Sequence, residues 1–255
     1  MINKYLPYFI FKPLFGDRKQ FGLQIDETDP DYRLWKENYL QFYNDNQKGK
    51  IGSIVNRFGF SIIKSLDFQN KTVLELGPGI IEHTCFFSSI PHAYYLADID
   101  PQFLQYSQKI LQENQFKNVK SILMSSNKVD IPLESNSVDI VLSFHQLEHV
   151  FQLENHIAQI KRVLKPNGIL AGSVPTEGAL AWGLGRFLTS RPYVKKHMTF
   201  NYDKVICWEH PNFVDKIKSQ LAKQFQIQKF VKKPFPFLPI DFNLSLSFIC
   251  RNQSL

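Results

Sequence analysis

Short apolar runs alternate with helix-like patterns through the middle of this 255-residue chain, and this alternation limits its fold more than any other feature. Five runs have the length, apolar content and flanking turn residues of strands. They cover residues 72–76, 92–97, 119–124, 138–143 and 169–174. Strands separated by helices pair in parallel, because each helix carries the chain back across the sheet. The pattern therefore predicts an α/β fold with a doubly wound, mostly parallel sheet.

The segments around these runs carry the signals of helix ends. Asp100 and Pro101 suit the start of a helix, because a carboxylate caps free backbone N–H groups and proline needs no donor in the first turn. The pattern over 153–164 ends at basic residues that are followed by proline and glycine, as helices commonly do. A later helix is expected from Asn212 onward. Two closing strands are expected at 226–231 and 244–250, the last of them antiparallel.

The composition is that of a globular protein with an uneven charge. Hydrophobic residues make up 44% and charged residues 21%, which excludes a disordered or fibrous chain. The net charge is +7, and residues 176–255 alone hold twelve basic against five acidic side chains. A basic final third can attract an anionic binding partner such as a phosphorylated metabolite, a sugar nucleotide, an acidic lipid or RNA. The alternative is an ordinary solvated surface.

Cysteine content and hydropathy bear on the compartment. The three cysteines, Cys85, Cys207 and Cys250, are too few and too scattered for a disulfide framework or a structural zinc site, and predict a reducing, cytoplasmic setting. No apolar run reaches the ~18 residues that span a bilayer, and the N-terminus does not read as a signal peptide. The aromatic segment 5–15 is interrupted by two prolines, so we expect it to pack as a lid, with contact to a membrane surface as the alternative.

A glycine turn and a carboxylate follow the first two strands. The run Glu75-Leu76-Gly77-Pro78-Gly79 ends the first strand, and Asp98 ends the second. Glycines let the backbone approach a ligand closely, and a carboxylate there can accept hydrogen bonds from both hydroxyls of a ribose. Dinucleotides and S-adenosylmethionine both fit this arrangement. The dinucleotide fingerprint needs a third glycine where Glu82 stands, and an acid beside a pyrophosphate is unfavourable, so the methyl donor is favoured.

Four motifs in order resemble the class I S-adenosylmethionine-dependent methyltransferases, of the type 11 kind. They are residues 73–79 (VLELGPG), 96–101 (LADIDP), 137–150 (SVDIVLSFHQLEHV) and 162–168 (RVLKPNG). The resemblance covers about residues 70–175 and implies a Rossmann-like methyltransferase sheet with an N-terminal helical cap. It divides the chain into a cap or lid at 1–70, a cofactor-binding core at 71–175, and an acceptor-binding insert with closing strands at 176–255.

The same resemblance assigns cofactor contacts. It places the methionine end of S-adenosylmethionine beside three residues of the glycine turn and the ribose on Asp98. The implied cofactor-binding residues are Glu75, Gly77, Gly79, Asp98, Asn127 and Ser143. Asn127 would lie near the adenine, and Ser143 to His145 beside the reacting methyl group. The chain departs from the family pattern at Ile81, where a third glycine is common, and at Asn127, where an acid is common.

Two histidines just beyond the fourth strand are the candidate catalytic residues. His145 and His149 would share one helical face if a helix began there, and a histidine can remove the proton of an oxygen acceptor. His145 is the first candidate base, whereas His149 could instead position the loop. With Glu148 they also spell an inverted zinc-peptidase motif, but that chemistry needs both histidines on a helix and a third ligand. We therefore expect no metal site, with divalent-metal binding as the minor alternative.

The segment after the fifth strand is expected to build the acceptor pocket. Trp182, Arg186 and His210 are its candidate substrate-binding residues, because aromatic faces stack on rings and arginine reads phosphate. No Asn-Pro-Pro-Tyr-like tetrapeptide follows the fourth strand, so methylation of nucleic acid is not expected. The favoured reaction is O-methylation of a small molecule or glycan precursor. The alternatives are an NAD-dependent oxidoreductase and a non-catalytic binding protein, and the oligomeric state stays open.

Overall fold

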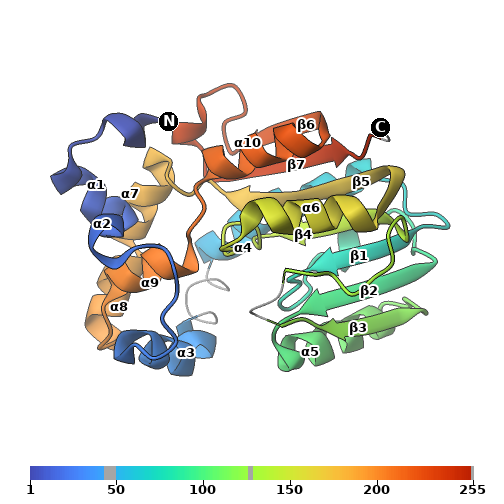
Figure 1. Cartoon of the computed structure of the whole chain (residues 1–255), viewed down its shortest axis with the longest axis horizontal. Coiled ribbons are helices and arrows are strands. Elements are labelled where there is room, and N and C mark those ends of the chain that lie inside the picture. The colour runs from blue at the N-terminus through green and yellow to red at the C-terminus, as the bar shows by residue number, and fades with distance from the viewer. Residues whose placement is uncertain (43–49, 126–128, 254–255) are drawn as a thin grey trace.

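The computed structural model describes residues 1–42, 50–125 and 129–253, and a seven-stranded sheet runs through its centre (Figure 1). The strands are β1 (Thr72–Leu76), β2 (Ala93–Asp98), β3 (Val119–Leu123), β4 (Val138–Phe144), β5 (Leu164–Pro175), β6 (Gln226–Lys233) and β7 (Ser245–Arg251). Their order is β3-β2-β1-β4-β5-β7-β6. The first five are parallel, and β7 is antiparallel to both of its neighbours. The predicted doubly wound fold is confirmed.

Helices cover both faces of this sheet and bury a separate core on each side. One face packs against α6 (Leu153–Val163) and α10 (Val214–Gln224), through side chains such as Ile157 and Leu221. The other packs against α4 (Lys50–Phe60), the 3₁₀ turn η3 (Ser61–Ser65) and α5 (Pro101–Glu113), with Phe60, Ile63 and Leu104 in its core. Successive strand residues point to opposite faces, so the buried runs of the sequence supply both cores.

A third hydrophobic cluster joins helices from the two ends of the sequence. The N-terminal elements are η1 (Ile2–Tyr5), α1 (Tyr8–Phe15), α2 (Arg18–Phe21) and α3 (Pro30–Phe42), and the later ones are α7 (Leu180–Leu188), α8 (Ser190–His197) and α9 (Tyr202–Glu209). Tyr32 and Trp35 of α3 pack with Val194 of α8 and Trp208 of α9. The indole Nε1 of Trp208 also donates to the Phe21 carbonyl at 3.0 Å. These helices together form the cap of the molecule (Figure 1).

Most predicted elements lie where expected, and the differences have local causes. Asp100 caps α5, because its carboxylate accepts from the backbone N–H groups of Gln102 and Phe103. Strand β5 begins at residue 164, before the turn that the sequence suggested, since Leu164 already pairs with Val138. Helix α10 begins after the expected Asn212.

Asn212 is kept out of α10 by its own hydrogen bonds. Its side-chain amide donates to the carbonyls of Leu147 and Val150, in the loop after β4. In the N-terminal segment, the two prolines do not break the chain as expected, because Pro7 precedes α1 and Pro13 lies inside it. A proline inside a helix removes one backbone hydrogen bond, and α1 continues for only two residues beyond it.

The connection from β1 to β2 contains no α-helix. All of residues 77–92 are described, and their only regular element is the short 3₁₀ turn η4 (Thr84–Phe86). Parallel strands are usually linked by a helix. Here the corresponding face of the sheet is covered instead by η3 and by the rings of Phe86 and Phe87, which pack against the core on that side.

Within the described part of the chain, no helix is long and apolar enough to cross a membrane.

Packing between β4 and β5 yields a stability prediction at Gly172. A Cβ added there would lie 1.8 Å from the Ser143 carbonyl oxygen, so the two strands would have to separate. Gly172→Ala is expected to lower the free energy of unfolding by about 3 kcal/mol or more, as overpacking against backbone does. Gly185→Ala in α7 is the matched control, because a Cβ there meets nothing within 4 Å. Urea unfolding of both variants tests this, and equal stabilities would contradict it.

Candidate active site

The carboxyl ends of β2, β1 and β4 meet at one edge of the sheet. Leu76 of β1 pairs with Ala97 of β2 on one side and with Ser143 of β4 on the other. Sequence order reverses on the two sides of β1, and ligands of doubly wound folds bind at such a switch point. The structure thus brings the glycine turn, Asp98 and the start of the His145 loop together, as their positions after successive strands predicted.

The turn after β1 requires glycine at two positions. Gly77 and Gly79 have φ angles of +61° and +53°, in the left-handed region that favours glycine. The Gly77 N–H donates to the Ala97 carbonyl at 2.8 Å, which ties the turn to β2. A Cβ on Gly77 would lie 2.6 Å from Cγ of Gln146. Both conformation and space therefore exclude a side chain at Gly77.

Asp98 is held beside this turn by backbone donors. Its Oδ2 accepts from the Gly79 N–H at 3.3 Å, and its Oδ1 accepts from the Asp100 N–H at 3.0 Å. The residue is 8% exposed, and burial raises the pKa of its carboxyl. A carboxylate offers about four acceptor positions. The two hydrogen bonds do not use all of these positions, so the carboxylate can also accept from a hydroxyl group of a ligand, as the role expected for Asp98 requires.

Glu75 lies one residue before the turn and is engaged inside the protein. Its Oε2 accepts from the Tyr94 hydroxyl at 2.6 Å, and its Oε1 lies 3.2 Å from Nε2 of His83. The carboxyl group is buried, and the His83 ring packs against the rings of Phe60 and Phe87. A contact of Glu75 with the methionine end of the cofactor stays a prediction.

Ser143 begins a short polar chain at the end of β4. Its hydroxyl donates to Oε1 of Gln146 at 3.1 Å, and Nε2 of Gln146 lies 3.1 Å from Nε2 of His156. The amide must be the donor in the second contact, so the imidazole of His156 is neutral at that nitrogen. This agrees with burial, which lowers the pKa of His156 to about 4. Asn127, the residue expected near the adenine, lies outside the described residues.

The two candidate catalytic histidines do not share a helical face, and that expectation was wrong. His145 adopts a left-handed conformation with φ of +51°, which turns the chain at the end of β4. Residues 145–152 form turns, and α6 begins only at Leu153. The Asn212 side chain donates to two backbone carbonyls of this loop. These hydrogen bonds replace the ones that the carbonyls would accept inside a helix.

His145 presents an imidazole nitrogen without a hydrogen-bond partner. Its Nε2 is buried and unpaired, and so is the hydroxyl of Ser173. Both atoms lie near Gly59 of α4, where an added Cβ would be 3.5 Å from Nε2 and 2.1 Å from Oγ. Burial lowers the pKa of His145 to about 4, so the ring is neutral near pH 7. A neutral ring with a free nitrogen can accept a hydrogen bond or a proton.

His149 is anchored more firmly than His145. Its Nδ1 donates to the Glu209 carbonyl at 2.6 Å, and its ring lies 4.6 Å from that of His210. Burial and the nearby His210 lower the pKa of His149 to about 3. Between the two candidates lies Glu148, 1% exposed, with Oε1 3.9 Å from His145 and 3.8 Å from His149. Burial raises the pKa of the Glu148 carboxyl well above its usual range.

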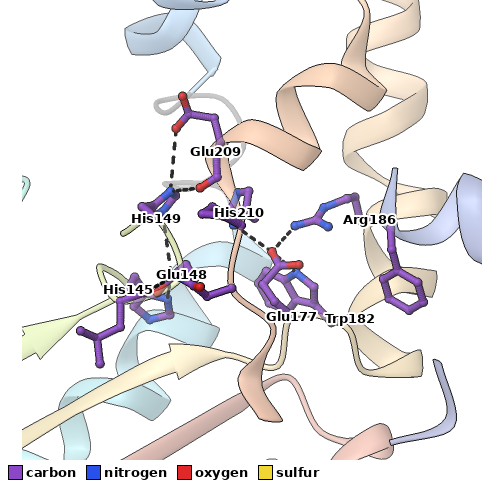
Figure 2. Close-up of polar contacts among 12 residues, drawn as sticks. His145, Glu148, His149, Glu177, Trp182, Arg186, Glu209 and His210 are labelled. Atoms are coloured by element: carbon purple, nitrogen blue, oxygen red, sulfur yellow. Dashed lines mark hydrogen bonds and ion pairs between the residues drawn. The ribbon is translucent and has the colours of Figure 1, made fainter. Parts of the chain in front are cut away.

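The three predicted substrate-binding residues gather around one buried carboxylate, Glu177 (Figure 2). Its Oε1 accepts from the indole Nε1 of Trp182 at 2.8 Å and from the guanidinium of Arg186. Nδ1 of His210 lies 3.0 Å from the same oxygen. Burial opposes the charge of Glu177, but Arg186 and His210 outweigh it and lower the pKa of this carboxyl.

Glu177, Gln146 and Ser173 are the site residues that the sequence analysis missed. Glu177 comes two positions after β5 ends, at the same edge of the sheet as Asp98 and His145. Its position just beyond the carboxyl end of a strand, like that of His145, is the sequence signal that marks it. Among the described residues, no three His, Cys, Asp or Glu side chains form a group that could hold a metal ion.

Removal of the Glu177 charge tests whether this cluster holds the cap to the core. Glu177→Gln leaves the buried guanidinium of Arg186 without a counter-charge, which is expected to lower the free energy of unfolding by about 3–5 kcal/mol. The matched control is Glu113→Gln, whose carboxylate is 61% exposed and pairs with Lys109 on α5. An exposed pair of this kind contributes about 0.5 kcal/mol or less. Equal urea midpoints for the two variants would contradict a structural role of Glu177.

Comparison with known proteins agrees with this geometry. Residues 74–172 match the family model of a methyltransferase domain. No curated protein sequence matches the chain. A proposed methyltransferase from Bacillus halodurans has a similar structure, with a TM-score of 0.54 at 14% identity over 76% of this chain and 97% of that one.

Two further structures show how widely the fold is used. A SAM-dependent methyltransferase from Methanosarcina mazei matches with a TM-score of 0.51 at 15% identity, over 75% of this chain and 97% of that one. The [4+2]-cyclase SpnF matches with a TM-score of 0.55 at 13% identity, over 79% of this chain and 82% of the cyclase chain. Fold alone therefore does not decide the reaction. Residues 74–172 of this chain therefore match a methyltransferase domain, and the sheet has the Rossmann-like fold of such domains.

Proposed function

We propose that this protein transfers the methyl group of S-adenosylmethionine to a hydroxyl oxygen of a small molecule or glycan precursor. The observation that carries the proposal is the junction of β1, β2 and β4. There the left-handed glycine turn and Asp98 adjoin the loop of His145, whose Nε2 has no partner. The glycine turn that would bind the cofactor therefore follows β1, and the neutral imidazole that would accept a proton follows the adjacent strand β4.

The chain's own residues favour this cofactor over a dinucleotide. Asp98 would accept hydrogen bonds from the ribose hydroxyls, and the glycine turn would let the methionine part lie against the backbone. When bound, S-adenosylmethionine supplies a methyl group on a positively charged sulfur. A dinucleotide would need a helix N-terminus for its pyrophosphate. The glycine turn is instead followed by irregular chain and the three-residue η4, and Glu82 there is exposed.

The protein's task in such a transfer is alignment and removal of one proton. The hydroxyl proton becomes more acidic as its oxygen gains the methyl group, so a positioned base with a low pKa can take that proton while the new C–O bond forms. Nε2 of His145 suits this role, because the depressed pKa keeps it unprotonated. Two other polar residues of the loop would hold it in position. His149 is hydrogen-bonded to the Glu209 carbonyl, and Glu148 has a buried carboxyl group whose pKa is raised.

The wall of the acceptor site is proposed to come from the cap. Trp182 and His210 would contact the acceptor from the side of α7 and α9. Arg186 is paired with Glu177, so its charge is already neutralised, and a phosphorylated acceptor would need other cations as well. We also place the protein in the cytoplasm, a proposal supported by the three cysteines, each of which is free.

Ligand binding tests the cofactor assignment. Isothermal titration should show that S-adenosylhomocysteine binds the wild-type protein and that NAD does not. Asp98→Ala removes the acceptor of the ribose hydroxyls and is expected to weaken binding about tenfold or more. Asp67→Ala is the control, because this exposed acid on the segment before β1 should leave the affinity unchanged. Binding of NAD in place of S-adenosylhomocysteine would refute the assignment.

The role of His145 has a kinetic signature. With an acceptor found by screening hydroxylated compounds and sugar nucleotides, His145→Gln should lower kcat by about 10²–10⁴-fold, the usual contribution of a general base. Affinity for S-adenosylhomocysteine should not change. Because the His145 pKa lies near 4, the wild-type rate should persist as pH falls through 6.5 and decline only near pH 4. A decline centred on an ordinary histidine pKa would exclude His145 as the base.

A further inference from the structure

Large apolar side chains are exposed together at one end of the molecule. Of the seventeen exposed large apolar side chains among the described residues, ten lie on η1, α1, α7 and the segment 235–242 that includes η5 (Ile240–Phe242). Tyr5 is 87% exposed, Phe237 80% and Phe9 77%. We call this surface the apolar end. Strand β3 and helix α5, which carry the exposed Leu123 and Tyr106, lie away from these elements at one edge of the sheet (Figure 1).

The elements of the apolar end contact one another although they are far apart in sequence. Helix α7 packs against both α1 and η5, and the backbone N–H of Ile2 donates to Asp241 in η5 at 3.1 Å. Gly183 is the contact of α7 with α1, since a Cβ there would lie 2.6 Å from the Phe15 ring. Leu184 and Leu188 therefore stand on a stripe of α7 that α1 does not cover, and Leu188 is 70% exposed.

Positive charge surrounds these side chains. Segments 1–16, 180–197 and 232–242 together contain eight Lys and Arg residues and a single acid, Asp241. Asp241 is buried and accepts from the Ile2 N–H, so it offers no negative charge to the surface. Lys195 and Lys196, exposed at the end of α8, form no ion pair with any described residue. Four of the eight cations are paired with acids of other segments: Lys4 with Asp215, Lys12 with Asp17, Arg186 with Glu177 and Arg191 with Asp203. The positive charge that is left for a ligand near the apolar end therefore comes from the lysines at 195, 196, 232 and 233.

We propose that the apolar end docks the protein onto the surface of a bilayer that contains anionic lipids. Aromatic side chains prefer the boundary between lipid tails and head groups, and lysines near it attract acidic head groups. The exposed rings sit on short elements, an eight-residue helix and the tip at Phe235 and Phe237, which can enter the boundary without spanning the membrane. On its inner side, α7 carries Arg186, so one helix separates the bilayer from Glu177.

Vesicle flotation tests the docking surface on the full chain. The probe is phosphatidylcholine vesicles with and without phosphatidylglycerol. The wild-type protein should float with the mixed vesicles, and less at high salt. The double variant Phe9→Ser/Phe237→Ser should reduce binding to the vesicles about tenfold or more, because two aromatic side chains that would be buried in lipid are removed. The matched control is Tyr106→Ser/Leu123→Ser, which replaces two side chains exposed by 56% and 62% on α5 and β3.

A second pair of variants separates charge from apolar insertion. Lys195→Glu/Lys196→Glu should abolish the preference for phosphatidylglycerol, whereas Lys117→Glu/Lys120→Glu, near β3, should keep it. No flotation of the wild-type protein, or equal flotation of the Phe9/Phe237 variant and its control, would overturn the proposal. Analytical ultracentrifugation of the same variants tests whether a second copy of the chain covers the apolar end instead. A wild-type dimer that the Phe9/Phe237 variant dissociates, without vesicle binding, would assign the surface to a second copy of the chain.

Discussion

The register of β1 between β2 and β4 is the constraint on which the candidate site depends. Leu76 pairs with Ala97 on one side and Ser143 on the other, so the residue after each strand emerges at the same edge. A shift of one residue would turn Glu75 and Leu74 to the opposite faces and move Asp98 away from the glycine turn. The two cores enforce this register, because each buries alternate residues of the same strands.

Buried polar groups then join the cap to this edge. Glu177 receives Trp182, Arg186 and His210 from the cap, while Asn212 holds the loop after β4 through two carbonyls. Arg18 adds a contact from the N-terminal segment, because its guanidinium donates to the His210 carbonyl at 2.7 Å. Groups of this kind are costly to bury alone and therefore keep their partners. The position of the His145 loop thus depends on residues from both ends of the chain.

Burial also sets the protonation states at the site. It lowers the pKa of His145 to about 4 and that of His149 to about 3, so both rings are neutral near pH 7, and it raises the pKa of the Glu148 carboxyl. Glu177 keeps a negative charge, because Arg186 and His210 compensate for its burial and lower the pKa of its carboxyl. The methyl donor is positively charged, and a histidine that stays neutral beside it avoids repulsion. Low local charge at the His145 loop is therefore consistent with the proposed reaction.

The sequence by itself determined the local features of this protein. The strand runs, the cap at Asp100 and the Gly77–Gly79 turn depend on neighbouring residues and on period, so they were predictable without a structure. Two things were decided only by tertiary contacts. His145 and His149 do not lie on the expected helix, because Asn212, more than 60 residues away, donates to the carbonyls of Leu147 and Val150 in their loop. Glu177 contacts Trp182, Arg186 and His210 because folding brings α7 and α9 to the end of β5. A local sequence pattern does not indicate such long-range contacts.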